Sequence, residues 1–204
     1  MIRSMFSATL LALLVSVSAQ AAVTTTIDDF TTPSSFPVVL VAGGSTSDNP
    51  ATNTVSGARM VTMVSGSGGA AALVGTSGGI MNLGLTNGSG VFDLSYSGGG
   101  LFSADAAGFF NVSLVGTDPS GTGTTVQIFV NGGSVAGPTA LNGGLNTIPV
   151  GTLGTVDAVT FRFDIPEDGD IMIDLTSHSC VPEPMSVAIW SMLGLVGLAV
   201  RRRK

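Results

Sequence analysis

The sequence predicts an all-β fold, a jelly-roll-like β-sandwich over residues 22–177, flanked by an N-terminal signal peptide and a C-terminal transmembrane helix. Within this body, short segments rich in Val, Thr, Ile and Phe alternate between apolar and polar residues, which is typical of strands with one buried face. Glycine accounts for 29 of the 204 residues and, with other turn formers, separates these segments. Regular short strands favour a sandwich over the alternative, a Gly/Ser-rich β-solenoid, because the sequence has no fixed repeat period.

The predicted strands follow one another along the body with turn signals between them. They cover residues 23–30, 37–41, 58–65, 80–85, 91–96, 109–115, 124–130, 156–163 and 171–176. Alternation is clear in 91–96, where Phe92, Leu94 and Tyr96 share one face. Residues 42–50 are predicted to be a loop by composition, and the glycines at 98–100 are predicted to end a strand. No segment of the body has the apolar spacing of an amphipathic helix.

The first 21 residues have the parts of a secretory signal peptide. Arg3 supplies the positive charge, and an apolar stretch, 5–17, follows it. Ala19 and Ala21 form an A-x-A site, so we expect signal peptidase to cleave after Ala21. The alternative, a retained membrane helix, is disfavoured because the apolar stretch is short and ends in small residues. The protein is therefore expected to be exported.

The C-terminal residues combine three parts in a fixed order. A linker, 178–184, contains Pro182, Glu183 and Pro184, and proline disfavours a helix there. Residues 185–200 are uncharged and mainly apolar, and as a helix they would measure about 24 Å, slightly less than the roughly 30 Å of a bilayer core. A basic tail, 201–204, follows, and its residues are Arg201, Arg202, Arg203 and Lys204. Because basic residues stay on the cytoplasmic side, the body is expected outside.

This terminal pattern resembles the PEP-CTERM sorting signal of exported proteins from Gram-negative bacteria. The resemblance covers residues 181–204 and rests on the Pro-Glu-Pro motif, the hydrophobic segment and the basic tail. It implies that exosortase, a membrane-embedded enzyme similar to cysteine proteases, recognises the signal and removes the helix. The body would then pass from a precursor held in the inner membrane to the cell surface or the extracellular matrix. A plain C-terminal membrane anchor is the alternative.

The body has a second, looser resemblance. Its IDDF segment at 27–30, its GAR segment at 57–59 and its last two predicted strands are similar to the jelly-roll bodies of many PEP-CTERM proteins. Those bodies in turn resemble galactose-binding or carbohydrate-binding modules. The resemblance implies a β-sandwich and an association with polysaccharide.

The charge of the body excludes several classes of partner. Without the two terminal segments, only Arg59 and Arg162 remain of seven cations, against twelve of thirteen acids, which gives a formal charge of −10. Such a body lacks the basic patch that nucleic acid or anionic lipid requires. We therefore expect no nucleic acid, and a membrane only through the C-terminal helix before processing. A neutral glycan, a cationic partner or a divalent ion would fit the charge.

The sequence offers little for catalysis, and we expect neither an enzyme nor a catalytic residue. His178 is the only histidine and Cys180 the only cysteine. Both are expected in the linker, where a Cys–His pair would lack a fixed geometry, and together they are too few to bind zinc. The lone cysteine excludes an internal disulfide and leaves pairing between chains open. Paired carboxylates for glycoside hydrolysis are harder to exclude, because Asp is frequent.

A structural calcium ion is the one cofactor that the sequence suggests. Calcium binds about six to eight oxygen atoms, from carboxylates and backbone carbonyls. Acidic residues end the first predicted strand and precede the last one, and these two strands are often neighbours in a sandwich. They are Asp28, Asp29, Asp164, Glu167, Asp168 and Asp170. The alternative is a solvated acidic turn.

Together these observations predict an exported, non-enzymatic protein of the cell surface or extracellular matrix, with a structural or adhesive role in an exopolysaccharide or biofilm. A carbohydrate-binding module is the first alternative and a glycan-acting enzyme the second. Aromatic residues for sugar binding are few, because Trp190 lies in the hydrophobic segment and Phe102 and Phe109 are the candidates for exposed rings. An exposed aromatic row would favour the module, and two facing carboxylates in a cleft would favour the enzyme.

Overall fold

Alternating apolar side chains build two antiparallel sheets in the computed structural model, which describes residues 23–31, 38–48, 54–68, 71–117, 123–166 and 169–180. These residues form thirteen strands and no helix, which confirms the all-β prediction. The predicted signal peptide, sorting motif, hydrophobic helix and basic tail lie outside them. In the described part of the chain, no helix is long and apolar enough to cross a membrane.

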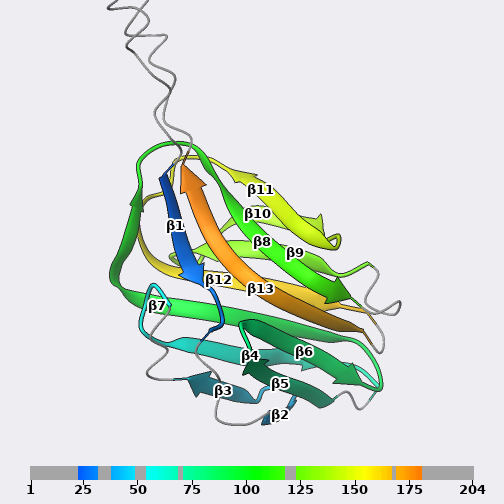
Figure 1. Cartoon of the computed structure of the whole chain (residues 1–204). Helices are drawn as coiled ribbons and strands as arrows, with labels where there is room; N and C mark the ends of the chain where they lie inside the picture. The colour runs from blue at the N-terminus through cyan, green and yellow to red at the C-terminus, as the bar shows by residue number, and fades with distance from the viewer. Residues whose placement is uncertain are drawn as a thin grey trace, which may run out of the picture. The chain divides into compact units, whose positions relative to one another are not determined.

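The strands divide into sheet A and sheet B (Figure 1). Sheet A has, in spatial order, β11 (Gly144–Val150), β8 (Gly108–Thr117), β13 (Asp170–Cys180), β6 (Ile80–Thr86), β5 (Ala71–Ser77) and β2 (Val38–Val41), with β1 (Val23–Asp28) beside β13. Sheet B has β10 (Gly133–Ala140), β9 (Thr125–Val130), β12 (Gly154–Ile165), β7 (Gly90–Ala104), β4 (Arg59–Gly66) and β3 (Ser45–Asp48). The two sheets confirm the predicted sandwich, whereas the jelly-roll connectivity stays a prediction.

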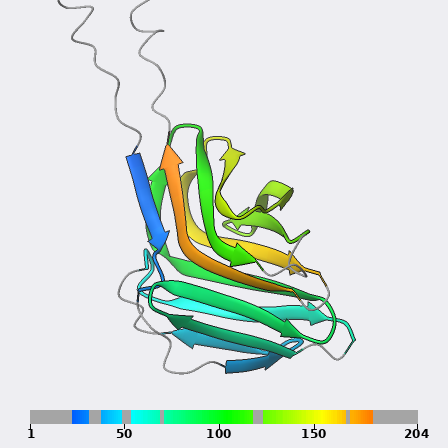
Figure 2. The same cartoon turned by 45° about the vertical axis from the view of Figure 1, so that its right-hand side comes forward.

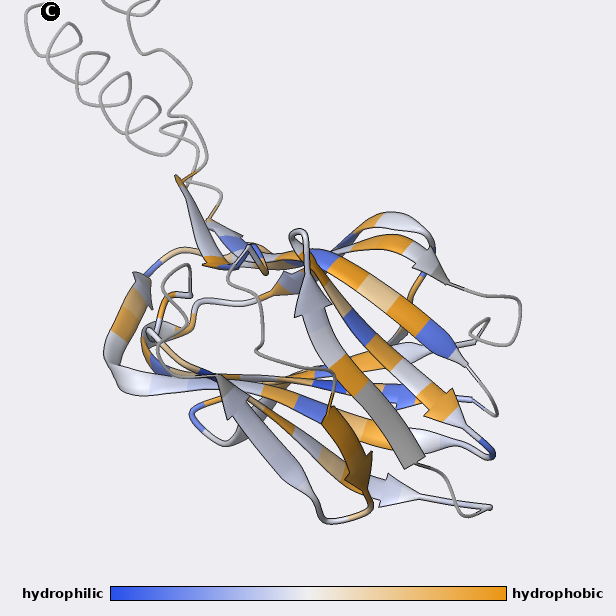
Figure 3. Ribbon diagram, turned by 60° about the horizontal axis from the view of Figure 1, so that its bottom comes forward, coloured by the Kyte–Doolittle hydropathy of each residue, from blue (hydrophilic) through white to orange (hydrophobic). Residues whose placement is uncertain are grey.

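The core between the sheets is made by alternate residues of the strands, and Figure 3 shows the resulting apolar and polar bands. Phe92 and Leu94 of β7, predicted to share a face, are both fully buried. Aromatic rings also meet across the core. The rings of Phe110 in β8 and Phe161 in β12 are perpendicular, with centroids 5.7 Å apart. Such pairs contribute about 0.5–1.5 kcal/mol beyond the burial of their area, so this contact helps to hold the sheets together.

The first and last strands are neighbours, as the prediction supposed, and Figure 2 shows β1 beside the long, curved β13. One edge of β13 pairs with β8 along its length. The other edge pairs first with β6 and then with β1. Because β13 extends to Cys180, the linker predicted to begin at residue 178 does not begin there. His178 and Cys180 belong to a central strand of sheet A.

Four strands lie where the sequence predicts none, namely β3 in the expected loop 42–50, and β5, β10 and β11. Three of them, β3, β10 and β11, are edge strands. An edge strand pairs with one neighbour only, so its residues need to alternate between apolar and polar less strictly than those of a central strand. Pro149 within β11 fits this position, because proline is tolerated where one side of the strand has no partner.

The glycines at 98–100 do not end a strand, because β7 continues through them to Ala104. The pairing with β12 passes from Ala158 opposite Ser97 to Val156 opposite Phe102, so β7 bulges between these pairs. The backbone N–H of Gly100 donates to the Asp157 carboxylate at 2.7 Å, which holds the bulge. A bulge adds residues to one strand without ending the sheet, and sequence composition alone does not distinguish it from a loop.

Candidate functional site

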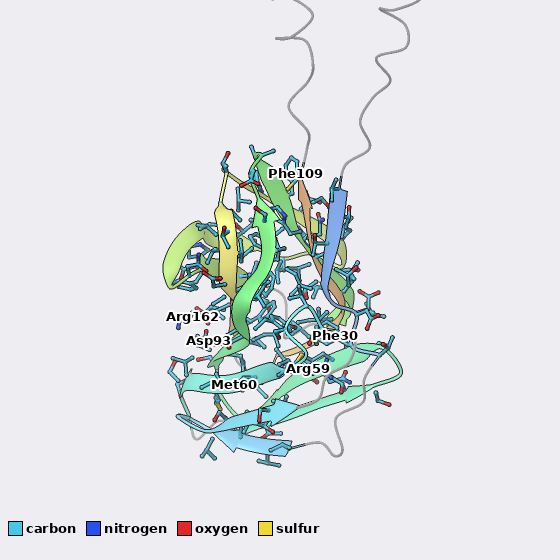
Figure 4. The ribbon with its side chains drawn as sticks, turned by 90° about the vertical axis from the view of Figure 1, so that its left-hand side faces the viewer. Phe30, Arg59, Met60, Asp93, Phe109 and Arg162 are labelled. Carbon is cyan, nitrogen blue, oxygen red and sulfur yellow. The ribbon has the colours of Figure 1, made fainter. Side chains whose placement is uncertain are left out.

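Asp28, a predicted calcium ligand, is bound to a cation between the two sheets. Nη1 of Arg59 in β4 donates to both Asp28 oxygens, at 3.2 and 3.0 Å, and both side chains are buried. The hydroxyl of Tyr96 in β7 donates to the same carboxylate at 2.9 Å, and the backbone N–H of Phe30 donates at 2.8 Å. In Figure 4, Phe30 and Arg59 lie close together. This buried cluster joins β1 of sheet A to two strands of sheet B.

The protonation of the cluster follows from its burial. Burial raises the pKa of the Asp28 carboxyl, although the charge of Arg59 acts in the opposite direction. Burial and the neighbouring Asp28 charge raise the pKa of the Tyr96 hydroxyl well above its ordinary value, so Tyr96 remains a hydrogen-bond donor. The cluster has the partners of a structural ion pair, and sequence reasoning missed it. Two features of the sequence could have indicated this pair. Arg59 is one of two cations in the body, and the looser resemblance includes both its GAR segment and the IDDF segment that contains Asp28.

Asp170, another predicted calcium ligand, is not brought together with Asp28. Asp28 lies opposite Thr176 in β13, whereas Asp170 begins that strand six residues earlier, about 20 Å away along the strand. The Asp29 carboxylate accepts hydrogen bonds from the N–H and hydroxyl of Thr31, at 3.0 and 2.7 Å. One ion therefore cannot bind both Asp28 and Asp170.

The acidic turn itself is described only in part. Asp164 is exposed in β12, and Glu167 and Asp168 lie outside the described residues. Among the residues that the structure describes, no group of three or more His, Cys, Asp and Glu side chains could hold a metal ion. Calcium at this turn stays a prediction.

His178 is a core residue. Its side chain is 1% exposed and stacks on the ring of Phe102, with centroids 5.3 Å apart, while the ring of Phe110 lies edge-on at 4.9 Å. Nδ1 lies 3.7 Å from Sγ of Cys180, and Nε2 has no hydrogen-bond partner among the described residues. Burial lowers the pKa of the imidazole. The neutral ring is packed between phenylalanines, away from the surface that a substrate could reach.

The outer surface of sheet B provides the best candidate site. It carries the second ion pair of the body, an aromatic ring and several hydroxyl groups on its four inner strands. We call this surface the sheet B face, and its residues are Gln127 and Phe129 of β9, Thr160 and Arg162 of β12, Asp93 and Ser95 of β7, and Met60 and Thr62 of β4. Figure 4 shows Met60, Asp93 and Arg162 on the same side of the molecule.

Arg162 is the centre of this face. Its Nε and Nη2 donate to the two oxygens of Asp93, each at 2.7 Å, in the parallel geometry of a guanidinium–carboxylate pair. Cζ lies 4.9 Å from the centroid of the Phe129 ring, so the planar cation also packs on the aromatic face. The hydrogen bonds that Arg162 donates to Asp93 raise the pKa of Arg162. The side chains of Arg162 and Asp93 are 36% and 17% exposed, so a partner can reach both.

The strand register aligns the rest of the face into a row. Phe129 lies opposite Thr160, Thr160 opposite Ser95, and Ser95 opposite Met60. The hydroxyl oxygens of Ser95 and Thr160 are 3.0 Å apart. This row crosses three strand spacings, about 14 Å. It places an aromatic ring at one end, hydroxyl groups in the middle and a methionine that is 45% exposed at the other end.

Sequence reasoning found the alternation of these strands but not the site. Arg162 and Asp93 are 69 residues apart, and their pairing depends on the register between β12 and β7. The candidate rings Phe102 and Phe109 are not part of it. Phe102 packs on His178, and Phe109 lies half-buried in β8 of sheet A. The described residues therefore contain no aromatic row, and Phe129 is the one ring on the sheet B face.

Comparison with known proteins gives no family for the chain. No family model matches it, and no curated protein matches it. Several solved structures of carbohydrate-binding modules are similar in part. A mutant of a family 29 module has 13% identity and a TM-score of 0.38, covering 78% of this chain and 92% of the module. A low-affinity xylan-binding module of family 86 from Roseburia intestinalis has 12% identity and a TM-score of 0.41, covering 69% and 97%.

A third structure is the family 11 module of a cellulosomal cellulase from Clostridium thermocellum. It has 16% identity and a TM-score of 0.36, and the alignment covers 80% of this chain and 97% of the module. At this level of similarity, the three structures assign the chain neither a family nor a ligand.

Proposed function

We propose that the chain is an exported, non-catalytic β-sandwich that binds an uncharged polysaccharide of the cell surface or extracellular matrix through the sheet B face. One observation carries this proposal. Phe129, the Arg162–Asp93 pair and the hydroxyls of Ser95 and Thr160 lie together on one open sheet surface. An adhesive or structural role in the matrix would follow from such binding.

The chemistry of the sheet B face suits sugar rings. A sugar presents an apolar C–H surface, which packs on an aromatic ring, and hydroxyls that both donate and accept hydrogen bonds. Phe129 and Met60 offer the apolar contacts, and the polar groups between them offer donors and acceptors. Arg162 is held by Asp93 and Phe129, so little side-chain entropy is lost when a ligand binds to it. The length of the row, about 14 Å, suits a short stretch of polysaccharide rather than one ring.

Charge supports an uncharged ligand. The body has a formal charge of −10, and the Arg162 charge is neutralised by Asp93 on the same face. An acidic polysaccharide would be repelled by the body and would find no free cation on the sheet B face. A neutral chain meets no such barrier.

A non-catalytic role fits the geometry of the carboxylates on this face. Glycoside hydrolysis requires one carboxyl group that donates a proton and a second that acts as base or nucleophile. Both oxygens of Asp93 accept hydrogen bonds from Arg162, so Asp93 is not available as a proton donor. No other residue of the sheet B face carries a carboxylate, so the second carboxyl group is missing there.

The test is a binding isotherm of the body, residues 22–181, which contains the compact unit Val23–Val181. Soluble glucan, mannan, xylan and galactan would serve as uncharged probes and polygalacturonate as an acidic one, each with calcium and then with chelator. We expect saturable binding to at least one uncharged polymer and none to the acidic polymer. Binding to none, or to the acidic polymer alone, would overturn the proposal. Loss of binding on chelation would add calcium to it.

Export and sorting rest on the terminal segments, and we propose signal peptidase, exosortase and the inner membrane as transient partners. Two sequence patterns support this route: the signal peptide pattern around Ala19 and Ala21, and the C-terminal succession of Pro-Glu-Pro motif, hydrophobic segment and basic tail. Replacing Pro182, Glu183 and Pro184 by alanine in the full chain, expressed together with an exosortase, should leave the body in the membrane fraction. Unchanged release of the body would contradict the sorting proposal.

A further inference from the structure

A groove lies on the outer surface of sheet A, which faces away from the sheet B face. It lies between β6 and the beginning of β13 and has a volume of about 280 Å³. Its lining residues are Asn82, Leu83, Gly84, Leu85, Thr86, Asp170, Ile171 and Met172. Sites for small molecules usually measure about 300–1,000 Å³, so this groove is slightly smaller than most of them.

Glycines create the groove. Gly84 of β6 lies opposite Asp170 of β13, and a Cβ atom at Gly84 would come within 2.6 Å of the Asp170 Oδ1 atom. The next pair is Asn82 opposite Met172, and Met172 has Gly116 of β8 as its neighbour on the other side. Glycine inside a strand weakens pairing and often marks a place where a ligand approaches the backbone closely. The two strands that flank β13, β6 and β8, each carry such a glycine beside the same segment of β13.

The side chains around the groove have the chemistry of a sugar site. Asp170 provides a carboxylate acceptor, Asn82 provides a donor and an acceptor, and Thr86 provides a hydroxyl. Met172 is 41% exposed and offers an apolar surface beside them. Because Gly84 has no side chain, the Asp170 carboxylate lies close against the backbone of β6 and forms part of the groove surface. Asp170 is the one charged residue in the lining, which disfavours an acidic sugar.

We propose that this groove is a second saccharide site, and that the chain binds two polysaccharide strands at once, one on each outer face of the sandwich. The inference rests on the proposed function for its ligand class, an uncharged sugar. Two sites on opposite faces cannot hold the same short segment of polymer. Binding at both sites therefore bridges two separate polysaccharide molecules, which gives the protein a cross-linking role in a matrix.

The experiment counts binding sites on the full chain, purified in detergent, by titration calorimetry with hexasaccharides of glucose, mannose, xylose and galactose. We expect two sites for at least one of these probes. Gly84→Ala displaces the Asp170 carboxylate, which lies over Gly84, and should leave one site. Phe129→Ala should also leave one site, and the double variant should leave none. Gly137→Ala in β10, where a Cβ meets nothing within 4 Å, is the matched control and should keep both.

A second measurement tests bridging. The unmodified chain should increase light scattering from a polymer of the sugar that binds, and either single variant should abolish the increase. Thermal unfolding of each variant checks that the fold is retained, and Asp170→Asn, which keeps the shape of the side chain, provides a second groove variant if Gly84→Ala unfolds.

The outcomes separate the two proposals. One site that is lost in Phe129→Ala and unaffected by both groove variants overturns the groove and leaves the proposed function intact. One site that is lost in the groove variants and unaffected by Phe129→Ala supports the groove and overturns the sheet B face. No binding to any probe overturns both.

Discussion

Arg59 and Asp28 form a buried ion pair between the two sheets, with Nη1 3.0 Å from one carboxylate oxygen and 3.2 Å from the other. The other cation of the body, Arg162, forms its pair with Asp93 on the surface. Cζ of each arginine also lies over a phenylalanine ring, Phe30 for Arg59 and Phe129 for Arg162. The same residue types therefore have two different roles, and burial decides between them.

Arg59→Met should destabilise the protein by about 3–5 kcal/mol, because it leaves the buried Asp28 carboxylate without its cation. Arg162→Met is the matched control, since it removes the same charge from a partly exposed pair and should change the free energy of unfolding by about 1 kcal/mol or less. Urea unfolding of both variants measures the difference. Equal losses would contradict the structural role of the buried pair.

Phe129→Ala should weaken polysaccharide binding at the sheet B face at least tenfold, enough to remove that site from the titration, since a lost ring contact is worth up to about 1.5 kcal/mol and Arg162 also loses the surface on which it packs. Phe109→Ala is the control, because Phe109 is half-buried in sheet A. Affinity for the uncharged polymer that binds most tightly is the measurement. An equal effect of the two substitutions would remove the sheet B face from the proposal.

Stability should fall when the pH drops below about 6.5, the ordinary pKa of histidine. Burial lowers the pKa of His178 in the folded state, so the unfolded chain binds its proton first. The contribution of the neutral ring is complete above the unfolded pKa and is lost as the pH falls through the folded pKa. Asp28 acts with the opposite sign, because its raised folded pKa favours the folded state on acidification.

The check is the midpoint of thermal unfolding between pH 7.5 and 5 for the unmodified chain and for His178→Phe, which cannot be protonated. The unmodified midpoint should fall over this range, and the variant should lose most of that dependence. The same dependence of the midpoint on pH in both proteins would show that groups other than His178 control the loss of stability.

Gly100→Ala should destabilise the protein by about 1–2 kcal/mol, because Gly100 has φ of +66° in the bulge of β7 and a side chain is strained there. Gly99→Ala is the matched control, since neither position has a neighbouring atom within 4 Å of an added Cβ and only Gly100 has a positive φ. Denaturant midpoints of the two variants should therefore differ, and similar midpoints would contradict the assigned bulge.

The alternation of residues such as Phe92, Leu94 and Tyr96 determined which side chains enter the core, because a strand places successive residues on opposite faces. The regular spacing of short strands and turns predicted the sandwich, and the frequent adjacency of terminal strands in sandwiches predicted that the first and last strands are neighbours. The alternation did not predict edge strands such as β3 and β10, because their formation depends on one hydrogen-bonded neighbour more than on a buried face. It did not predict the burial of His178 either, because that burial depends on where β13 ends.

The sequence by itself determined the all-β class, the spacing of the strands and a body with only two cations. Only the tertiary structure decided what those cations do. The partners of Arg59 and Arg162 lie 31 and 69 residues away. Which carboxylate each arginine reaches is set by the register of strands that are distant in sequence, and a shift of one residue would move every side chain to the other face. Local sequence patterns predict which side chains are buried, whereas a site made by several strands forms only when the register between them is fixed.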